Sequence, residues 1–238
     1  MSNKLKYLFL LAAPGLLAAI LLGQATKPAS SKITLDPNTK LEMINADSKW
    51  VEYRGRNALH LVPLSGHERA QNEEWLAVLS DSDFTDGTIE VDVAGARREG
   101  YPTIDDVRGF KGVIGVSFRV DDERAETFYV RPENSRVENQ LYRNNSTQYE
   151  SLPDFPWIRL DLESPRMYES YVDLEPGAWT KLKVEVSGIK ARLYVNGAAQ
   201  PCLIVNDLKN GYGHGKIALW TRVSTDAYFS DLKVTAAP

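Results

Sequence analysis

The sequence predicts an all-β protein, built as an antiparallel sandwich of two sheets. Apolar and polar residues alternate with a period of two from Ile33 onward, and the 3.6-residue period of an amphipathic helix is almost absent. Turn residues divide this region into about ten to twelve strands without a break in composition. With 238 residues, of which 43% are hydrophobic and 25% charged, the chain is long enough to bury one large core.

Six segments show the alternation clearly, at residues 87–95, 113–121, 180–188, 191–197, 216–222 and 227–234. In the first of them Ile89, Val91 and Val93 share one face, which we assign to the core. The turn SGIK (Ser187 to Lys190) joins two of the segments into a hairpin. The polar stretch Ala96 to Gly112 is predicted to be a loop over one rim of a sheet.

The N-terminus has the pattern of a secretory signal peptide. Two lysines, Lys4 and Lys6, precede the apolar run Leu8 to Leu22, and small residues lead to a predicted cut after Ala25. An uncleaved N-terminal anchor is the alternative, although the run is shorter than the roughly 20 residues of a spanning helix. We therefore expect a signal peptide or anchor at 1–25, a linker at 26–32 and the sandwich domain at 33–238, in an exported protein that is periplasmic or extracellular.

The charge balance argues against nucleic acid as a partner. The formal net charge is −4, and removal of residues 1–25 takes away two lysines and no acids. No basic stripe remains that could release counterions from a phosphate backbone. A membrane contact is expected only through an uncleaved N-terminal segment. The single cysteine, Cys202, cannot form an internal disulfide and is expected to be a small buried apolar group.

Six segments, taken in chain order, resemble the concanavalin A-like lectin/glucanase superfamily: FTDGTIEVDV, GVIGVSFRV, FYVRP, WTKLKVEVSGIKARLYVNG, KIALWT and AYFSDLKV. More narrowly, they are similar to exported bacterial laminin-G-like and 3-keto-disaccharide hydrolase-type domains. The resemblance extends from about Trp50 to Val234. It implies a jelly-roll sandwich and a carbohydrate ligand in the groove of its concave sheet. A structural Ca²⁺ is familiar in this superfamily, but the sequence assigns no ligand to one and implies no other cofactor.

The stretch FYVRPENS is the most distinctive part of this resemblance. If Phe128 and Val130 face the core, Tyr129 and Arg131 point outward together. Aromatic rings stack on the apolar face of a pyranose, and guanidinium groups read hydroxyls or carboxylates. The proposed ligand-binding set is Arg119, Tyr129, Arg131, Gln140, Tyr142, Trp157 and Arg159, with Glu133 and Asn139 at the edge. The alternative is an ordinary strand surface, stabilised by cross-strand Tyr–Arg pairs without a ligand.

Four members of this set rest on two further strand assignments. In ENQLYRNN we expect Leu141 to point inward and Gln140 and Tyr142 outward. In PWIRLDL (Pro156 to Leu162) we expect a strand whose apolar positions face the core and whose Trp157 and Arg159 face the groove.

Catalysis is the second hypothesis, and no catalytic residue is assigned. Glucanase-type enzymes of the superfamily carry E-x-D-x-x-E on a strand like that of Glu90 and Asp92, but the third position here is Gly95. We therefore expect these two acids to be rim or strand-pairing residues. A glycoside-cleaving enzyme of the 3-keto-disaccharide hydrolase type would instead use Glu133 or Asp161 beside Arg131. An envelope protein-interaction domain is the third hypothesis.

Overall fold

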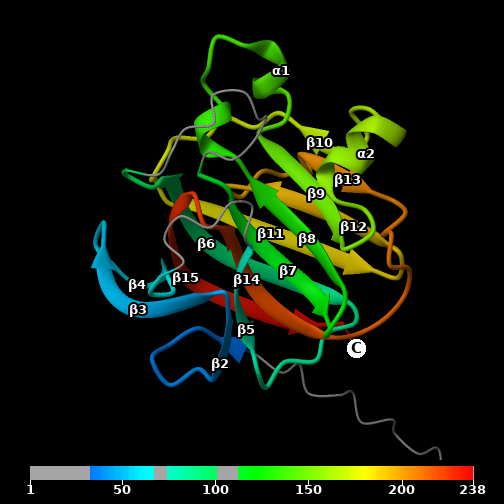
Figure 1. The fold of residues 1–238 in the computed structure, drawn as a ribbon. Helices are drawn as coiled ribbons and strands as arrows, with labels where there is room; N and C mark the ends of the chain where they lie inside the picture. The colour runs from blue at the N-terminus through cyan, green and yellow to red at the C-terminus, as the bar shows by residue number, and fades with distance from the viewer. Residues whose placement is uncertain (1–32, 67–73, 101–111, 238) are drawn as a thin grey trace, which may run out of the picture.

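A computed structural model describes residues 33–66, 74–100 and 112–237. In this part of the chain two antiparallel sheets pack face to face, which confirms the predicted two-sheet sandwich (Figure 1). The predicted signal peptide or anchor and the linker lie outside the described residues, as does most of the predicted loop at 96–112. No helix in the described part of the chain is long and apolar enough to span a membrane.

Sheet A contains eight strands in the order β13-β12-β11-β6-β15-β4-β3, with β1 added alongside β15. Their bounds are β1 Ile33–Thr34, β3 Ala46–Tyr53, β4 Arg56–Pro63, β6 Gly87–Arg97, β11 Thr180–Ser187, β12 Lys190–Val195, β13 Leu203–Val205 and β15 Thr225–Ala236. The predicted hairpin is β11 and β12, paired from Leu182 with Val195 to Ser187 with Lys190.

Sheet B contains seven strands in the order β10-β9-β8-β7-β14-β5-β2. Their bounds are β2 Leu41–Ile44, β5 Glu74–Leu79, β7 Ile114–Val120, β8 Ala125–Val130, β9 Thr147–Leu152, β10 Glu169–Ser170 and β14 Lys216–Arg222. The described residues thus hold fifteen strands, more than predicted, since the two- and three-residue edge strands are too short to show alternation.

The core lies between the sheets and contains the residues that alternation assigned to it. Ile89, Val91 and Val93 of β6 are buried there, as are Phe118 and Phe128 of sheet B. Cys202 is half-buried and packs against the same core. Its burial raises the pKa of the thiol to about 11, which fits the predicted inert apolar role.

Two segments predicted as strands are helices. The first is α1 (Gln140–Arg143), which is capped at its N-terminus by Asn139. Asn139 Oδ1 accepts hydrogen bonds from the amides of the first turn, and Leu141 is 47% exposed rather than buried. The second, α2 (Trp157–Glu163), buries Trp157 and Leu160, three residues apart on one helical face. A short 3-10 helix, η1 (Pro132–Asn134), follows β8.

Candidate functional site

The outer face of sheet B, the face turned away from the core, carries Tyr129 and Arg131 as predicted. Phe128 and Val130 belong to the core, so the residues on either side of each project outward. Alternation on the neighbouring strands brings Gln148 of β9 beside Tyr129, since these two residues are paired in register. The sequence predicted that the side-chain amide on this face would be that of Gln140. The structure supplies Gln148 in its place.

An aromatic layer forms the floor of this face. The rings of Tyr129 and Trp220 lie 4.6 Å apart between centroids, and Val113 and Leu76 pack against them. Gly115 lies between the two strands that bring these rings together. A Cβ at this position would collide with the Phe128 carbonyl oxygen and would come within 2.6 Å of the Tyr129 Cβ. A glycine is therefore required for the strands to approach so closely.

Arg131 organises one half of the polar layer above this floor. Its guanidinium donates to the Tyr129 hydroxyl at 2.9 Å, to Gln148 Oε1 at 3.0 Å and to the Asn145 carbonyl at 3.0 Å. The indole of Trp157 lies 5.5 Å from the guanidinium carbon, a cation–π contact. Trp157 thus contacts Arg131, although it comes from α2 rather than from the predicted strand.

Arg222 organises the other half and holds two carboxylates. Its Nη2 lies 3.0 Å from Glu74 Oε1 and 3.3 Å from Glu150 Oε1. The other oxygen of Glu150 accepts the backbone N–H of Trp157 at 3.1 Å. Glu74, Tyr129, Arg131, Gln148, Glu150 and Arg222 are called here the sheet B network.

Burial and mutual charge shift the protonation of this network. Desolvation by burial, reinforced by the neighbouring Glu150 carboxylate, raises the pKa of Glu74 from 4.5 to about 7, although Arg222 acts in the opposite direction. Burial also raises the pKa of the Tyr129 phenol above its ordinary value, so the phenol stays protonated at neutral pH. Desolvation alone would lower the pKa of Arg222, but Glu150 and Glu74 outweigh it and keep the guanidinium charged.

The network meets solvent at one end only. The side chain of Glu74 is 23% exposed and that of Arg222 is 10% exposed, whereas Glu150 has no exposed surface. Tyr129 and Arg131 are buried, at 1% and 0% exposure. The expectation of an open groove walled by Tyr129 and Arg131 is therefore wrong for the described conformation. A ligand would meet Glu74 and Arg222 first.

Arg119 does not lie in this network. Its backbone has a φ of 51°, next to a register irregularity between β7 and β14, and this turns the side chain away from the predicted direction. The buried guanidinium donates to the carbonyls of Thr85, Gly188 and Gly211 at 2.7 to 3.1 Å. It also pairs with the Asp86 carboxylate at 3.1 Å. These contacts tie together the segments around Thr85, Gly188 and Gly211, which is a structural role.

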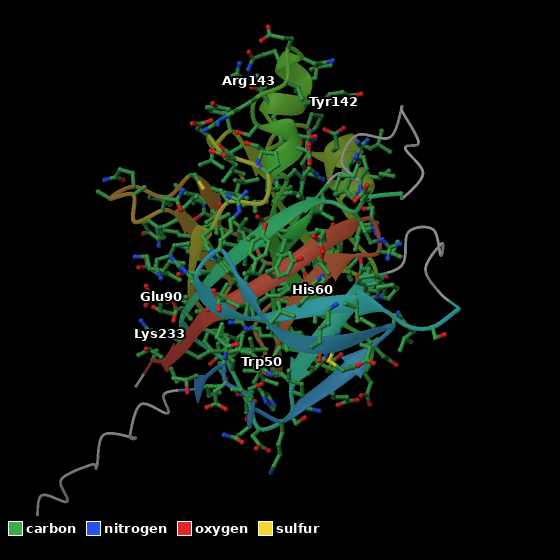
Figure 2. The ribbon with its side chains drawn as sticks, turned by 90° about the vertical axis from the view of Figure 1, so that its left-hand side faces the viewer. Trp50, His60, Glu90, Tyr142, Arg143 and Lys233 are labelled. Atoms are coloured by element: carbon green, nitrogen blue, oxygen red, sulfur yellow. The ribbon has the colours of Figure 1, made fainter. Side chains whose placement is uncertain are left out.

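The other predicted residues lie away from the network, on helices and loops. Glu133, in η1, accepts the Arg97 N–H at 3.1 Å, and Arg159, on α2, pairs with Glu163 at 2.7 Å. Asn139, Gln140 and Tyr142 belong to the α1 region, which stands beyond the strand ends in Figure 1 and is marked by Tyr142 and Arg143 in Figure 2. Their placement fails because the segment is a capped helical turn.

Glu90 and Asp92, which match part of the glucanase motif, have structural partners. Asp92 is buried and bound by Arg56 and by Lys181, the latter at 2.8 Å, while Glu90 is paired in register with Lys233 of β15, next to which it lies in Figure 2. Both belong to sheet A, so neither is part of the sheet B network, in agreement with a strand-pairing role. Asp161 lies on α2, half-buried.

Alternation within two further segments, applied to their outer faces, also predicts the missing members. In TQYESL (Thr147–Leu152) Tyr149 faces the core, which turns Gln148 and Glu150 outward. In KIALWTR the positions Trp220 and Arg222 share the outer face, and Glu74 begins β5 opposite Arg222. The pairing of these strands side by side, however, is not contained in any local pattern.

Metal binding has no support in the described residues: between 33 and 66, 74 and 100, and 112 and 237, no group of three or more His, Cys, Asp or Glu side chains is arranged to hold an ion.

Comparison with known proteins establishes the fold. No protein-family model matches the sequence, and no curated protein matches it. Among solved structures, the carbohydrate binding module CBM66 from Bacillus subtilis is 13% identical, with a TM-score of 0.50 over 81% of this chain and 96% of that one. A putative glycosyl hydrolase from Parabacteroides distasonis is 11% identical, with a TM-score of 0.48 over 81% of this chain and 94% of that one.

The exoplasmic/lumenal domain of VIP36, in a form with Ca²⁺ and Man2 bound, is 10% identical, with a TM-score of 0.46 over 83% of this chain and 81% of that one. At such identities the likeness concerns the fold alone. The described chain is a concanavalin A-like jelly-roll β-sandwich, as the resemblance in the sequence implied.

Proposed function

We propose that the protein is an exported, periplasmic or extracellular carbohydrate-binding domain whose glycan contacts the sheet B network. The main support for this proposal is that two guanidinium groups and two carboxylates lie over the aromatic floor of Tyr129 and Trp220. Planar guanidinium and carboxylate groups can bind pairs of sugar hydroxyls through charge-assisted hydrogen bonds. Glycan recognition by a protein of this fold, the CBM66 module, supports the proposal as an analogy.

The desolvation free energy of the buried charges also supports a role in ligand binding. Removing several charges from water is expensive, and a well-packed apolar face would stabilise the sheet at least as well. Arg131 Nε is buried and has no hydrogen-bond partner in the described part of the chain. Buried donors in native proteins are nearly always satisfied, by protein, water or ligand. A hydroxyl-rich ligand that enters beside Glu74 and Arg222 would extend this hydrogen-bonding layer.

A glycan-array screen of the purified protein, followed by calorimetric titration of the strongest binder, tests the proposal. We expect Glu74→Gln to weaken binding at least tenfold, because it removes a carboxyl group at the end of the network that meets solvent. Lys183→Gln, on the opposite sheet, serves as the matched control and should bind as wild type. Wild-type affinity in Glu74→Gln, with both variants folded by thermal melting, would place the site elsewhere.

Glycoside cleavage is a second candidate, favoured by one specific observation. Glu74 and Glu150 lie within hydrogen-bond distance of the same Arg222 nitrogen, which brings two carboxyl groups together, and glycoside hydrolysis uses a pair of carboxyl groups. Glu74, with a pKa near 7, would give its proton to the leaving oxygen, and water would supply the new hydroxyl at the anomeric carbon. In this hypothesis Glu74 and Glu150 take the place of Glu133 and Asp161, the candidate acids named from the sequence.

Release of new reducing ends from the glycans that bind the array tests this candidate. Activity is expected to fall above about pH 7, where Glu74 loses its proton, and to be lost in both Glu74→Gln and Glu150→Gln. The absence of turnover in wild type, with binding intact, would leave the protein a binding domain only.

A further inference from the structure

A second candidate site lies on the outer face of sheet A, on the opposite side of the sandwich from the sheet B network. A cleft of about 390 Å³ opens there, lined by Arg56, Asp92, Trp179, Lys181, Asn196 and Gly197. These residues come from β4, β6 and β11, from the residue before β11, and from the turn after β12. The volume falls in the range of small-ligand sites in proteins.

One buried carboxylate holds two cations at the cleft. Asp92 has a side-chain exposure of only 7%, and its two oxygens bind Arg56 and Lys181 separately. Each of those cationic side chains is 39% exposed, so each keeps donors turned toward solvent. Asp231 approaches Arg56 at 3.5 Å but is not among the lining residues. The lining therefore carries one more positive than negative charge.

The rest of the cleft is lined by an aromatic side chain and a side-chain amide. Trp179 is half-buried, with the Arg56 guanidinium 5.1 Å from its ring and the Tyr53 ring against its edge. Asn196 accepts the Lys181 N–H through Oδ1 at 3.0 Å, and its Nδ2 makes no hydrogen bond within the described residues. Gly197 has open space where a side chain would be, which leaves that end of the cleft accessible.

We propose that this cleft binds a carboxylate-bearing saccharide, a hexuronate unit of an acidic glycan. The carboxylate would accept hydrogen bonds from Arg56 and Lys181, which Asp92 holds in place. The sugar ring would pack against Trp179, and a hydroxyl would accept a hydrogen bond from Asn196. The site differs from the sheet B network in having exposed, cationic groups, so the two sites would select glycans of different charge.

Calorimetric titration with a tri-hexuronate, and with the neutral tri-hexose of the same linkage, tests the inference. The acidic trisaccharide should bind at least tenfold more tightly than the neutral one. Arg56→Gln and Lys181→Gln should each weaken it at least tenfold, whereas Lys183→Gln, a cation of the same strand outside the lining, should not change it. Arg56→Lys keeps the charge beside Asp92 and should weaken binding only severalfold, because the planar fork is lost.

Glu74→Gln separates this inference from the proposed function, since the acidic trisaccharide should bind that variant as it binds wild type. Equal affinity for acidic and neutral trisaccharides would overturn the inference, as would unchanged affinity in both Arg56→Gln and Lys181→Gln. Competition by acetate as effective as that by the tri-hexuronate would also overturn it, since the cleft would then take any small carboxylate.

Discussion

The outer faces of the two sheets use charge in opposite ways. On sheet B, every residue of β7 and β8 is buried, and the Arg222–Glu150 pair lies almost entirely out of solvent. On sheet A, β11 alternates buried with half-buried or exposed positions, and Arg56 and Lys181 keep more than a third of their side-chain surface in solvent. The same alternation rule thus gives an enclosed ion network on one face and an accessible one on the other.

This difference has an energetic meaning. An exposed ion pair contributes little to stability, since water solvates both partners well in the unfolded chain. A buried network loses that solvation, so it is held together by its internal pairing and is sensitive to the loss of any member. Substitutions on sheet B should therefore change stability far more than matched substitutions on sheet A.

Arg222→Met should give the largest effect. Glu74 and Glu150 would both lose their cation while remaining largely buried, and the free energy of unfolding should fall by about 3–5 kcal/mol. Urea denaturation at pH 8, where Glu74 is ionised in wild type, measures this loss. A decrease below about 1 kcal/mol would mean that Arg222 behaves like a surface residue.

The pH dependence of stability isolates Glu74. Its folded-state pKa of about 7 lies above the ordinary 4.5, so the folded protein holds this proton more tightly than the unfolded chain does. The stabilisation of the folded state by this tighter proton binding is complete below about pH 4.5 and is lost as pH rises to about 7. Relative to Glu74→Gln, wild type should lose up to about 3 kcal/mol over this range.

Thermal or urea denaturation of both proteins at half-unit pH steps checks that difference. A gap between wild type and Glu74→Gln that stays constant from pH 4.5 to 7.5 would mean that Glu74 titrates as an ordinary surface carboxyl.

Gly115→Ala tests the aromatic floor. The added methyl group meets the Phe128 carbonyl and the Tyr129 Cβ, so β7 and β8 must move apart, at a cost of about 1–3 kcal/mol or more. Gly213→Ala is the matched control, because its Cβ would meet nothing within 4 Å and its backbone lies outside the left-handed region. Equal melting temperatures for the two variants would show that Gly115 is not needed for close packing.

Lys183→Gln on sheet A should give the smallest effect. The Lys183–Glu185 pair is 2.8 Å long, but the two side chains are 33% and 39% exposed. The free energy of unfolding should change by less than about 1 kcal/mol, and 0.5 M NaCl should reduce the change further. A loss comparable to that of Arg222→Met would remove the contrast between the two faces.

The sequence predicts the strands well where alternation is long. The segment predicted at 216–222 coincides with β14, and the outward direction of Tyr129 and Arg131 is correct. It fails at PWIRLDL, where Ile158, Leu160 and Leu162 alternate as in a strand. Only Leu160 of the three is buried, together with Trp157 one helical turn away, so helical packing overrides a short local pattern.

The site is predictable only in part, for a different reason. FYVRP supplies Tyr129 and Arg131, which are close in sequence, but Glu74, Glu150 and Arg222 come from three strands separated by 72 or more residues. Their convergence depends on which strands are neighbours in sheet B, and a period of two within a strand contains no such information. Burial of the network likewise depends on the whole fold.

Ligand mapping by amide chemical-shift perturbation tests the central claim most directly. With the strongest neutral glycan from the array at saturation, we expect shifts to concentrate on Glu74, Tyr129, Glu150 and Arg222 of sheet B. Lys181 and Asn196 of sheet A should remain unchanged. Shifts confined to sheet A, or to α1, would contradict the assignment of the sheet B network as the carbohydrate site.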